Sequence, residues 1–173
     1  MTDTSEKFLI DSNAIITPYQ QYYPFDFAKV FWDSLEKELQ SGAIVLLDLV
    51  RDEIVKGNDS LSEWAKGFDS IVLDRRQPEI IKTYSEVLEY INKSKVYSDI
   101  ALKNWSGVTI ADPWLIAVAS VFDYTVISFE KNAGNLSTTN PSNKPKIPDI
   151  CSEFGVECKD LFYMMRQLSF LFT

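Results

Sequence analysis

The sequence predicts an α/β domain in which a mostly parallel central sheet lies between two layers of helices, giving three layers in all. Short apolar runs that suit buried strands alternate along the chain with segments whose apolar residues recur at helical spacing. The 173 residues, 46% of them hydrophobic, suffice for one core and are too few for two ordinary domains. We therefore predict a single domain over residues 1–173, with ligands at the carboxyl ends of its strands.

The beginning of the chain predicts a strand, a loop and a helix. Residues 7–10 are an apolar run that ends in Asp11, and residues 18–24 are a loop rich in tyrosine and proline. The helix that follows has Gly42 at a position typical of a helix end. Its apolar residues recur at helical spacing and are Phe27, Phe31, Leu35 and Leu39.

The next predicted strand is the apolar run at residues 43–47, which suits a buried position. Asp48 then caps a short helix that carries Glu53. Residues 60–63 have the sequence Ser-Leu-Ser-Glu, the pattern of a capping box, and predict the start of another short helix. Residues 71–73 form either a brief strand or an extended link.

An amphipathic helix is predicted to begin at Pro78, because proline suits the first turn of a helix. Its apolar stripe is formed by Ile81, Tyr84, Leu88 and Ile91. Residues 98–105 predict another short helix, and Asp112, followed by proline, begins an apolar helix. That helix leads into a strand at residues 124–128.

The last part of the chain contains its only compositionally biased segment. Residues 131–148 are rich in asparagine, serine, threonine and proline, and predict a long mobile loop within the domain. A short helix at residues 149–154, a strand around Val156 and a last helix at residues 161–168 complete the predicted fold.

The chain has no histidine and only two cysteines, and this restricts its chemistry. Catalysis by Ser-His-Asp or Cys-His groups is excluded because neither would have a base, and a zinc site would lack ligands. Carboxylates, a lysine, a tyrosine or a metal held by carboxylates remain. Because hard oxygen ligands favour Mg²⁺ or Mn²⁺, we expect one of these ions as the cofactor.

Several features predict a cytoplasmic protein without membrane association. No apolar stretch approaches the roughly 20 residues needed to cross a bilayer, and the first residues lack the pattern of a signal peptide. Two cysteines are too few to cross-link a chain of this length, which fits a reducing compartment. The net charge of −8 counts against tight non-specific binding to nucleic acid, although clustered active-site acids would contribute to it.

Four acidic residues lie at the ends of predicted strands or on predicted helices. Asp11 follows the first strand in Phe-Leu-Ile-Asp-Ser-Asn, and Glu53 lies in the helix sequence Val-Arg-Asp-Glu-Ile. Asp112 opens the helix sequence Asp-Pro-Trp-Leu-Ile-Ala-Val-Ala, and Glu130 ends the strand sequence Val-Ile-Ser-Phe-Glu. In this order the four segments, over roughly residues 7–132, resemble PIN-domain nucleases, especially the ribonuclease toxins of toxin–antitoxin pairs.

The resemblance implies a PIN-like fold and a metal-dependent endoribonuclease that hydrolyses RNA phosphodiester bonds. The implied catalytic and metal-binding residues are Asp11, Glu53, Asp112 and Glu130. The implied supporting polar residues are Ser12, Asn13 and Ser128. A divalent cation would relieve the repulsion among the gathered carboxylates and activate water without a histidine. The implied partners are RNA, a cognate antitoxin protein and a second copy of the chain in a homodimer.

Basic and aromatic residues are candidates for contacts with the RNA. Lys131, Lys144 and Lys146 are predicted to bind phosphates, together with Arg166. Tyr19, Tyr22 or Tyr23 would stack on bases. The alternative is that the loop lysines are simply solvated and that the tyrosines beside prolines pack against the protein.

Each acid also has a structural interpretation. Asp11 suits a turn, and Asp112 suits the N-terminal cap of a helix. Glu53 is alternatively a solvated residue of its helix, where its neighbour Asp52 competes with it for the site, and Glu130 is alternatively a surface acid beside Lys131. Glu130 departs from the family pattern, which has aspartate there, and its carboxylate lies one methylene further from the backbone.

Two other functions remain open. The first is a catalytically inactive PIN-like interaction module that keeps the fold without the activity. The second is a phosphohydrolase with an aspartyl-phosphate intermediate, but that chemistry places a second acid where this chain has Asn13. A nucleotide-binding module is disfavoured because the six glycines form no phosphate-binding loop.

Overall fold

The computed structural model describes residues 5–172 of the chain, so the ends of the predicted domain, residues 1–4 and 173, lie outside the described part. Its centre is a four-stranded parallel sheet with the strand order β2-β1-β3-β4. The strands are β1 (Phe8–Ile10), β2 (Ile44–Val45), β3 (Thr125–Ile127) and β4 (Cys158–Lys159). The predicted α/β architecture with a parallel sheet is confirmed.

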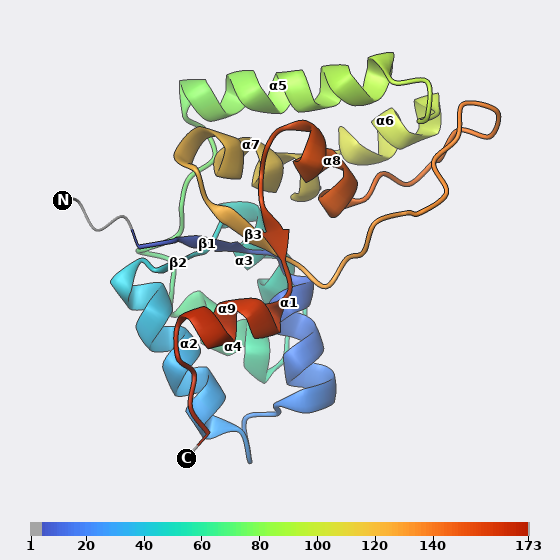
Figure 1. Cartoon of the computed structure of the whole chain (residues 1–173). Helices are drawn as coiled ribbons and strands as arrows, with labels where there is room; N and C mark the ends of the chain where they lie inside the picture. Colours follow the sequence, from blue (N-terminus) through green and yellow to red (C-terminus); the bar gives the residue numbers. More distant parts are fainter. Residues whose placement is uncertain (1–4, 173) are drawn as a thin grey trace.

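Helices cover both faces of this sheet. They are α1 (Asn13–Thr17), the π-helix η1 (Pro18–Tyr22), α2 (Lys29–Ser41), α3 (Asp48–Val55), α4 (Ser60–Lys66), α5 (Pro78–Lys93), α6 (Asp99–Trp105), α7 (Asp112–Phe122), α8 (Ile147–Glu153) and α9 (Leu161–Gln167). Figure 1 shows α5, α6, α7 and α8 on one side of the sheet, and α1, α2, α4 and α9 on the other. None of the helices in the described part has the length and apolar character needed to cross a membrane.

The two central strands are buried on both faces, which explains why their sequences are apolar runs without alternation. Every residue of β1 is at most 1% exposed, and Val126 and Ile127 of β3 are fully buried. Helix α7 lies between the sheet and α5, and its residues Leu115 to Ala119 are buried. Because β1 and β3 pair in parallel, their carboxyl ends lie at the same edge of the sheet.

Two helices differ from the sequence prediction in their apolar face. Helix α2 begins at Lys29, and Phe27, expected in its stripe, is 72% exposed before it. In α5 the buried residues are Ile80, Val87 and Ile91, whereas Ile81 is 44% exposed. Because residues 80 and 81 are both isoleucine, the sequence alone allows either one to start the stripe, and packing against α7 decides.

Two local predictions are corrected in the first half of the chain. Residues 18–22, expected as a loop, continue α1 as a π-helix, in which the amide of Tyr23 donates to the carbonyl of Pro18 at 2.6 Å. Pro18 has no amide hydrogen, so the regular α-helical bonding is interrupted there. The capping box of α4 begins at Asp59 and not at Ser60, because Asp59 and Ser62 exchange hydrogen bonds.

The long connection at residues 131–146 has no helix or strand, as expected, but it is held at several points. Figure 1 shows it projecting from the end of β3, passing beside α6 and returning to α8. Ser142 pairs with Tyr97 in an isolated parallel bridge next to the start of α6. In residues 71–73, predicted as a brief strand or an extended link, Ile71 belongs to a turn and Leu73 forms one bridge with Leu47.

Candidate active site

The carboxyl ends of β1 and β3 place polar residues side by side. In the parallel register of these strands Ile10 lies opposite Ile127, and the amide of Asp11 donates to the carbonyl of Ile127 at 2.8 Å. Asp11 and Ser128, which follow the paired residues, therefore emerge together at one edge of the sheet. Both are buried, with exposed fractions of 4% and 3%.

Ser128 joins three of the residues singled out from the sequence. Its hydroxyl donates to Oδ2 of Asp11 at 2.9 Å and accepts a hydrogen bond from Nδ2 of Asn13 at 3.1 Å. It also accepts the backbone amide of Glu130 at 3.1 Å. Asn13 in turn accepts the amide of Phe129 at 3.0 Å. The side chains that follow β1 and the backbone that follows β3 are thus fixed to one another.

Asp11 is a buried carboxylate whose charge is only partly compensated. Burial raises its pKa to about 6, and the nearby charges of Glu53 and Glu130 raise it too. Hydrogen bonds from the hydroxyl of Ser128 and the amide of Ser12, the latter 2.7 Å long, oppose this rise in the pKa. Asp11 therefore keeps a single orientation, but its ionised form at neutral pH is destabilised by burial and by the neighbouring negative charges.

Asp112 is the first residue of α7, which runs back along the sheet towards the start of β3. The start of this helix consequently lies at the same edge as the carboxyl ends of the strands. The pKa of Asp112 is raised to about 7. Burial is the largest cause, and the charges of Asp11, Glu130 and Glu53 raise this pKa further. The four acids, which are spread over more than a hundred residues of sequence, are close enough to influence one another electrostatically.

Glu53 and Asp52, the two competing acids of α3, have different surroundings. Asp52 forms a 2.7 Å ion pair with Arg51. Glu53 is exposed, forms no ion pair within residues 5–172, and its charge raises the pKa of both Asp11 and Asp112. These contacts support Glu53 as the member of the acidic cluster.

Glu130 lies beside this cluster, but its carboxylate is engaged elsewhere. Its Oε2 accepts the backbone amide of Ile147 at 2.8 Å, and its Oε1 is 3.3 Å from Nζ of Lys146. Lys146 directly precedes α8, and Ile147 is the first residue of that helix. The extra methylene of glutamate is what carries the carboxylate away from the backbone of β3 to this segment.

The acidic cluster has the chemistry of a site for a hard divalent cation. Its donors are carboxylate and hydroxyl oxygens, and the buried carboxylate of Asp11 and the partly buried carboxylate of Asp112 repel each other. A bound Mg²⁺ or Mn²⁺ would offset that repulsion. As the side chains stand, residues 5–172 contain no group of three or more acidic or cysteine side chains arranged to hold a metal ion.

The predicted RNA-contacting residues are dispersed. Lys146 pairs with Glu130, whereas Lys131 and Lys144 are exposed along the connection at residues 131–146. Tyr19 and Tyr23 pack against aromatic residues, as in the alternative interpretation. The ring centroids of Tyr19 and Phe25 are 5.3 Å apart, and those of the stacked Tyr23 and Phe31 are 4.7 Å apart.

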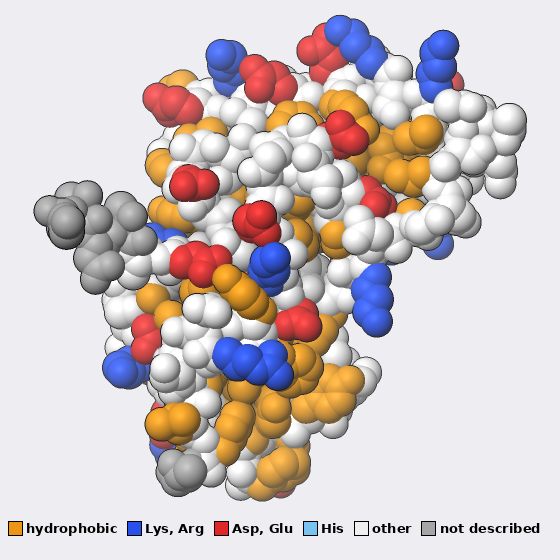
Figure 2. Space-filling view, in the orientation of Figure 1, with side chains coloured by type: hydrophobic (Ala, Val, Ile, Leu, Met, Phe, Trp, Pro, Cys, Tyr) orange, Lys and Arg blue, Asp and Glu red, His pale blue; other side chains and the backbone are white. Residues whose placement is uncertain are grey.

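Arg166 lies on a different surface from the acids. It borders a hollow of about 440 Å³ formed by α9 and the residues after it. Figure 2 shows apolar side chains gathered on this lower part of the molecule. Phe162, Leu171 and Phe172 of this region are 37%, 66% and 52% exposed.

Helix α7, which begins at Asp112, also carries an aromatic contact that the sequence analysis did not predict. Trp114, two residues further along α7, stacks on Tyr84 of α5 with ring centroids 3.8 Å apart. The guanidinium of Arg75 lies 5.4 Å from the Trp114 ring. The stripe position of Tyr84 indicated burial, but nothing in the local sequence indicated its partner.

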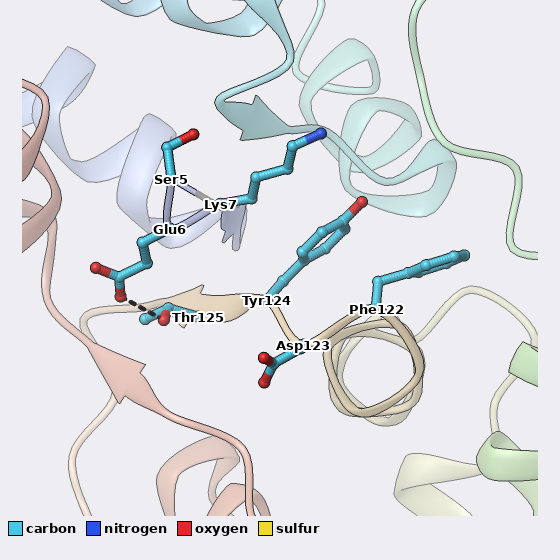
Figure 3. A pocket seen from close by; sticks show the side chains of 7 residues that line it. All are labelled: Ser5, Glu6, Lys7, Phe122, Asp123, Tyr124 and Thr125. Atoms are coloured by element: carbon cyan, nitrogen blue, oxygen red, sulfur yellow. Dashed lines mark hydrogen bonds between the residues drawn. The ribbon is translucent and has the colours of Figure 1, made fainter. Parts of the chain in front are cut away.

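The largest of the described cavities, about 650 Å³, is unrelated to the acidic cluster. Figure 3 shows that Glu6 and Lys7 line it from the segment before β1, and Tyr124 and Thr125 from the start of β3. Glu6, Lys7 and Tyr124 precede the strands, and Thr125 is the first residue of β3, so the cavity lies at the amino ends of these strands. Its polar contact is a 2.6 Å hydrogen bond from Thr125 to Glu6.

Residues 8–172 match the family described as "Domain of unknown function (DUF4411)". The chain belongs to the DUF4411 family. The DUF4411 match includes the whole sheet and all four acids, so the acidic cluster lies within the family's domain. A search of curated proteins found none similar to this DUF4411 member.

Proposed function

We propose that this DUF4411 protein is a PIN-like, metal-dependent endoribonuclease. The observation that carries the proposal is the pair of carboxylates formed by Asp11, which is buried, and Asp112, which is partly buried, whose pKa values are raised to about 6 and about 7. Ordinary turn or cap residues are solvated and have no reason to gather. Perturbed acids that face one another are typical of functional sites.

The composition of the site supports phosphodiester hydrolysis with Mg²⁺ or Mn²⁺. The chain has no histidine to act as a base, so its carboxylates are the groups available to bind a cation. Asp11, Glu53 and Asp112 would hold it, with Glu130 beside them. When bound, such a cation supplies activated water and stabilises the charge that develops on the phosphate.

The residues around Asp11 would orient it for this task. The hydroxyl of Ser128 binds Oδ2 of Asp11, and the amide of Ser12 binds Oδ1. Asn13 fixes Ser128 and the backbone at Phe129. Because these contacts hold the carboxylate in one direction, little reorganisation is needed when the charged substrate arrives.

The charge distribution supports an RNA substrate. In a chain of net charge −8, residues 131–148 contain Lys131, Lys144 and Lys146 and no acidic residue. This basic segment begins directly after Glu130, at the edge of the acidic cluster. It therefore offers positive charge to the phosphate backbone of a nucleic acid beside the proposed site.

We propose further that the protein acts in the cytoplasm as the toxin of a toxin–antitoxin pair, with an antitoxin protein and a second copy of the chain as partners. The resemblance to PIN-domain toxins is the main support. The exposed apolar residues Phe162, Leu171 and Phe172 give a surface suited to a protein partner.

A catalytically inactive interaction module is the alternative. Two observations favour it: the side chains of the described residues form no ready-made metal site, and Glu130 is engaged by Lys146 and Ile147. In that case the acidic cluster would remain as a buried pair of carboxyl groups, protonated in part at neutral pH.

The deciding experiment compares the wild-type chain with Asp11→Asn in a cleavage assay on mixed RNA with Mg²⁺ or Mn²⁺, and in calorimetric titration with Mn²⁺. We expect the wild type to cut RNA and bind Mn²⁺, and the variant to do neither. Asp26→Asn, at an exposed position, serves as the matched control and should behave as the wild type. A wild-type chain that neither binds Mn²⁺ nor cuts RNA favours the interaction module.

A further inference from the structure

Hydrogen bonds and an ion pair hold together the two ends of the connection at residues 131–146, which we call its base. One fastening is Glu130, which binds the amide of Ile147 at 2.8 Å and Lys146 at 3.3 Å. The other is Asp149 in the first turn of α8, which accepts Nδ2 of Asn132 at 2.7 Å and the amide of Ala133 at 2.9 Å. The start and the end of the connection therefore run side by side next to the acidic cluster.

The outer part of the connection is fastened to a different element, the start of α6. The amide of Ser142 donates to the carbonyl of Val96 at 2.8 Å, and the amide of Ser98 donates to the carbonyl of Ser142 at 3.0 Å. The hydroxyl of Ser98 also donates to Oδ1 of Asn143 at 2.6 Å. Hydrogen bonds thus hold the basic segment both beside the acidic cluster and at the start of α6.

We infer that Glu130 is a positioning residue that closes the base of this connection, and that the divalent cation is bound by Asp11, Glu53 and Asp112 without it. The inference rests on the proposed function and changes the role that the family resemblance implies for Glu130. Its consequence is that the last acid of the pattern serves the substrate side of the site and not the metal side.

The engagement of both carboxylate oxygens is the first reason. If Glu130 turned to a cation, the amide of Ile147, a residue only 1% exposed, would lose its acceptor. Lys146 would lose its partner at the same time. The ion pair with Lys146 also neutralises much of the negative charge that would attract a cation.

The length of the side chain is the second reason. Aspartate at this position would keep its carboxylate closer to β3, as in the PIN pattern, and would not span the distance to Ile147. Glutamate reaches the segment before α8. The departure from the family pattern therefore matches the contact that is observed, and a substitution by aspartate separates the two roles.

The experiment uses three variants that break the base of the connection in different ways. Glu130→Ala removes the carboxylate, Glu130→Asp shortens the side chain, and Lys146→Met removes the ion pair at Oε1 without changing an acid. Hydrogen exchange of residues 131–146 reports on the connection, and Mn²⁺ titration reports on the metal site. Asp11→Asn is the reference for loss of a ligand.

We expect all three variants to exchange residues 131–146 about tenfold faster, the effect of losing a hydrogen bond of ordinary strength. Their affinity for Mn²⁺ should stay within about threefold of the wild type, whereas a lost ligand costs tenfold or more, roughly. With RNA, the KM should rise about tenfold while kcat changes by less than about threefold.

Two results would overturn the inference. One is a loss of Mn²⁺ affinity in Glu130→Ala as large as that in Asp11→Asn, above all if Glu130→Asp restores it. The other is unchanged exchange of residues 131–146 in both Glu130→Ala and Lys146→Met. If the wild-type chain binds no Mn²⁺ and cuts no RNA, the proposed function fails by itself, and the exchange measurement alone decides whether Glu130 closes the connection.

Discussion

The hydroxyl of Ser128 donates a 2.9 Å hydrogen bond to the carboxylate of Asp11, although 117 positions separate the two residues in the sequence. Parallel pairing of β1 with β3 brings them together, because each follows the last residue of its strand. The same hydroxyl accepts from Asn13 and from the amide of Glu130. One small side chain therefore connects both halves of the acidic edge.

Replacing Ser128 by alanine is expected to destabilise the fold and the acidic site together. Asn13 and the amide of Glu130 lose an acceptor, which costs roughly 1–3 kcal/mol in the free energy of unfolding. The pKa of Asp11 should also rise above about 6, because the Ser128 hydrogen bond lowers it. Urea denaturation measures the first effect, and Mn²⁺ titration at pH 6 and pH 8 measures the second. Ser120→Ala, at an exposed position of α7, is the control; equal stability of the two variants would contradict the prediction.

The stability of the metal-free protein should fall as the pH rises through the titration of Asp11, which is buried, and Asp112, which is partly buried. The pKa values of Asp11 and Asp112 are raised from 3.8 to about 6 and about 7, so the folded state binds more protons than the unfolded state in this range. The contribution of these two groups to the free energy of unfolding is therefore fully present below pH 3.8, and it is lost as the pH rises through about 6 and about 7.

Asp112→Asn should remove part of that dependence. In the presence of a chelator we expect the variant to be more stable than the wild type at pH 8, by on the order of 1–3 kcal/mol, and similar to it near pH 4. Thermal unfolding across this pH range measures the difference, and Asp26→Asn controls for the loss of an exposed charge. Parallel stability curves for Asp112→Asn and the wild type would show that this carboxyl is not under electrostatic strain.

The two acids of α3 should separate clearly by substitution. Glu53→Gln is expected to weaken Mn²⁺ binding about tenfold, because it removes the charge that acts on both Asp11 and Asp112. Asp52→Asn should leave the affinity within about twofold, since its partner is Arg51. Both substitutions remove one negative charge from the same helix, so each controls for the other. A larger loss of Mn²⁺ affinity in Asp52→Asn than in Glu53→Gln would show that Asp52, and not Glu53, belongs to the site.

The capping box of α4 allows a direct comparison of adjacent residues. Asp59→Ala should lower the free energy of unfolding by about 1 kcal/mol, because the amide of Ser62 loses its acceptor. Ser60→Ala should change it by less than about 0.5 kcal/mol, as for other exposed positions. Chemical denaturation of the two variants decides between Asp59 and Ser60 as the cap.

Local patterns were sufficient for most of the fold. The apolar runs before Asp11 and Glu130 identify the two central strands because a strand buried on both faces has no polar alternation. Asp112-Pro113 likewise identifies the start of α7, since proline is tolerated there. From these element ends the meeting of the acids at one edge follows by topology alone.

The remaining features depend on contacts between distant segments or on a choice between equal neighbours. Ile80 and Ile81 are chemically identical, so only packing against α7 selects the buried one. Asp59 and Ser60 can both begin a cap, and the backbone conformation before α4 selects Asp59. The contact of Glu130 with Ile147 spans a connection of irregular structure, for which the sequence has no periodicity to read.

The fastened base of the connection after β3 has a practical consequence for labelling. Between Ala133 and Ser142, both of them anchored, lies an outward stretch of eight residues, 134–141, that can lengthen without separating β3 from α8. Doubling the length of a flexible segment costs only about 0.6 kcal/mol. An epitope or a fluorescent tag inserted there would leave both termini and the sheet untouched.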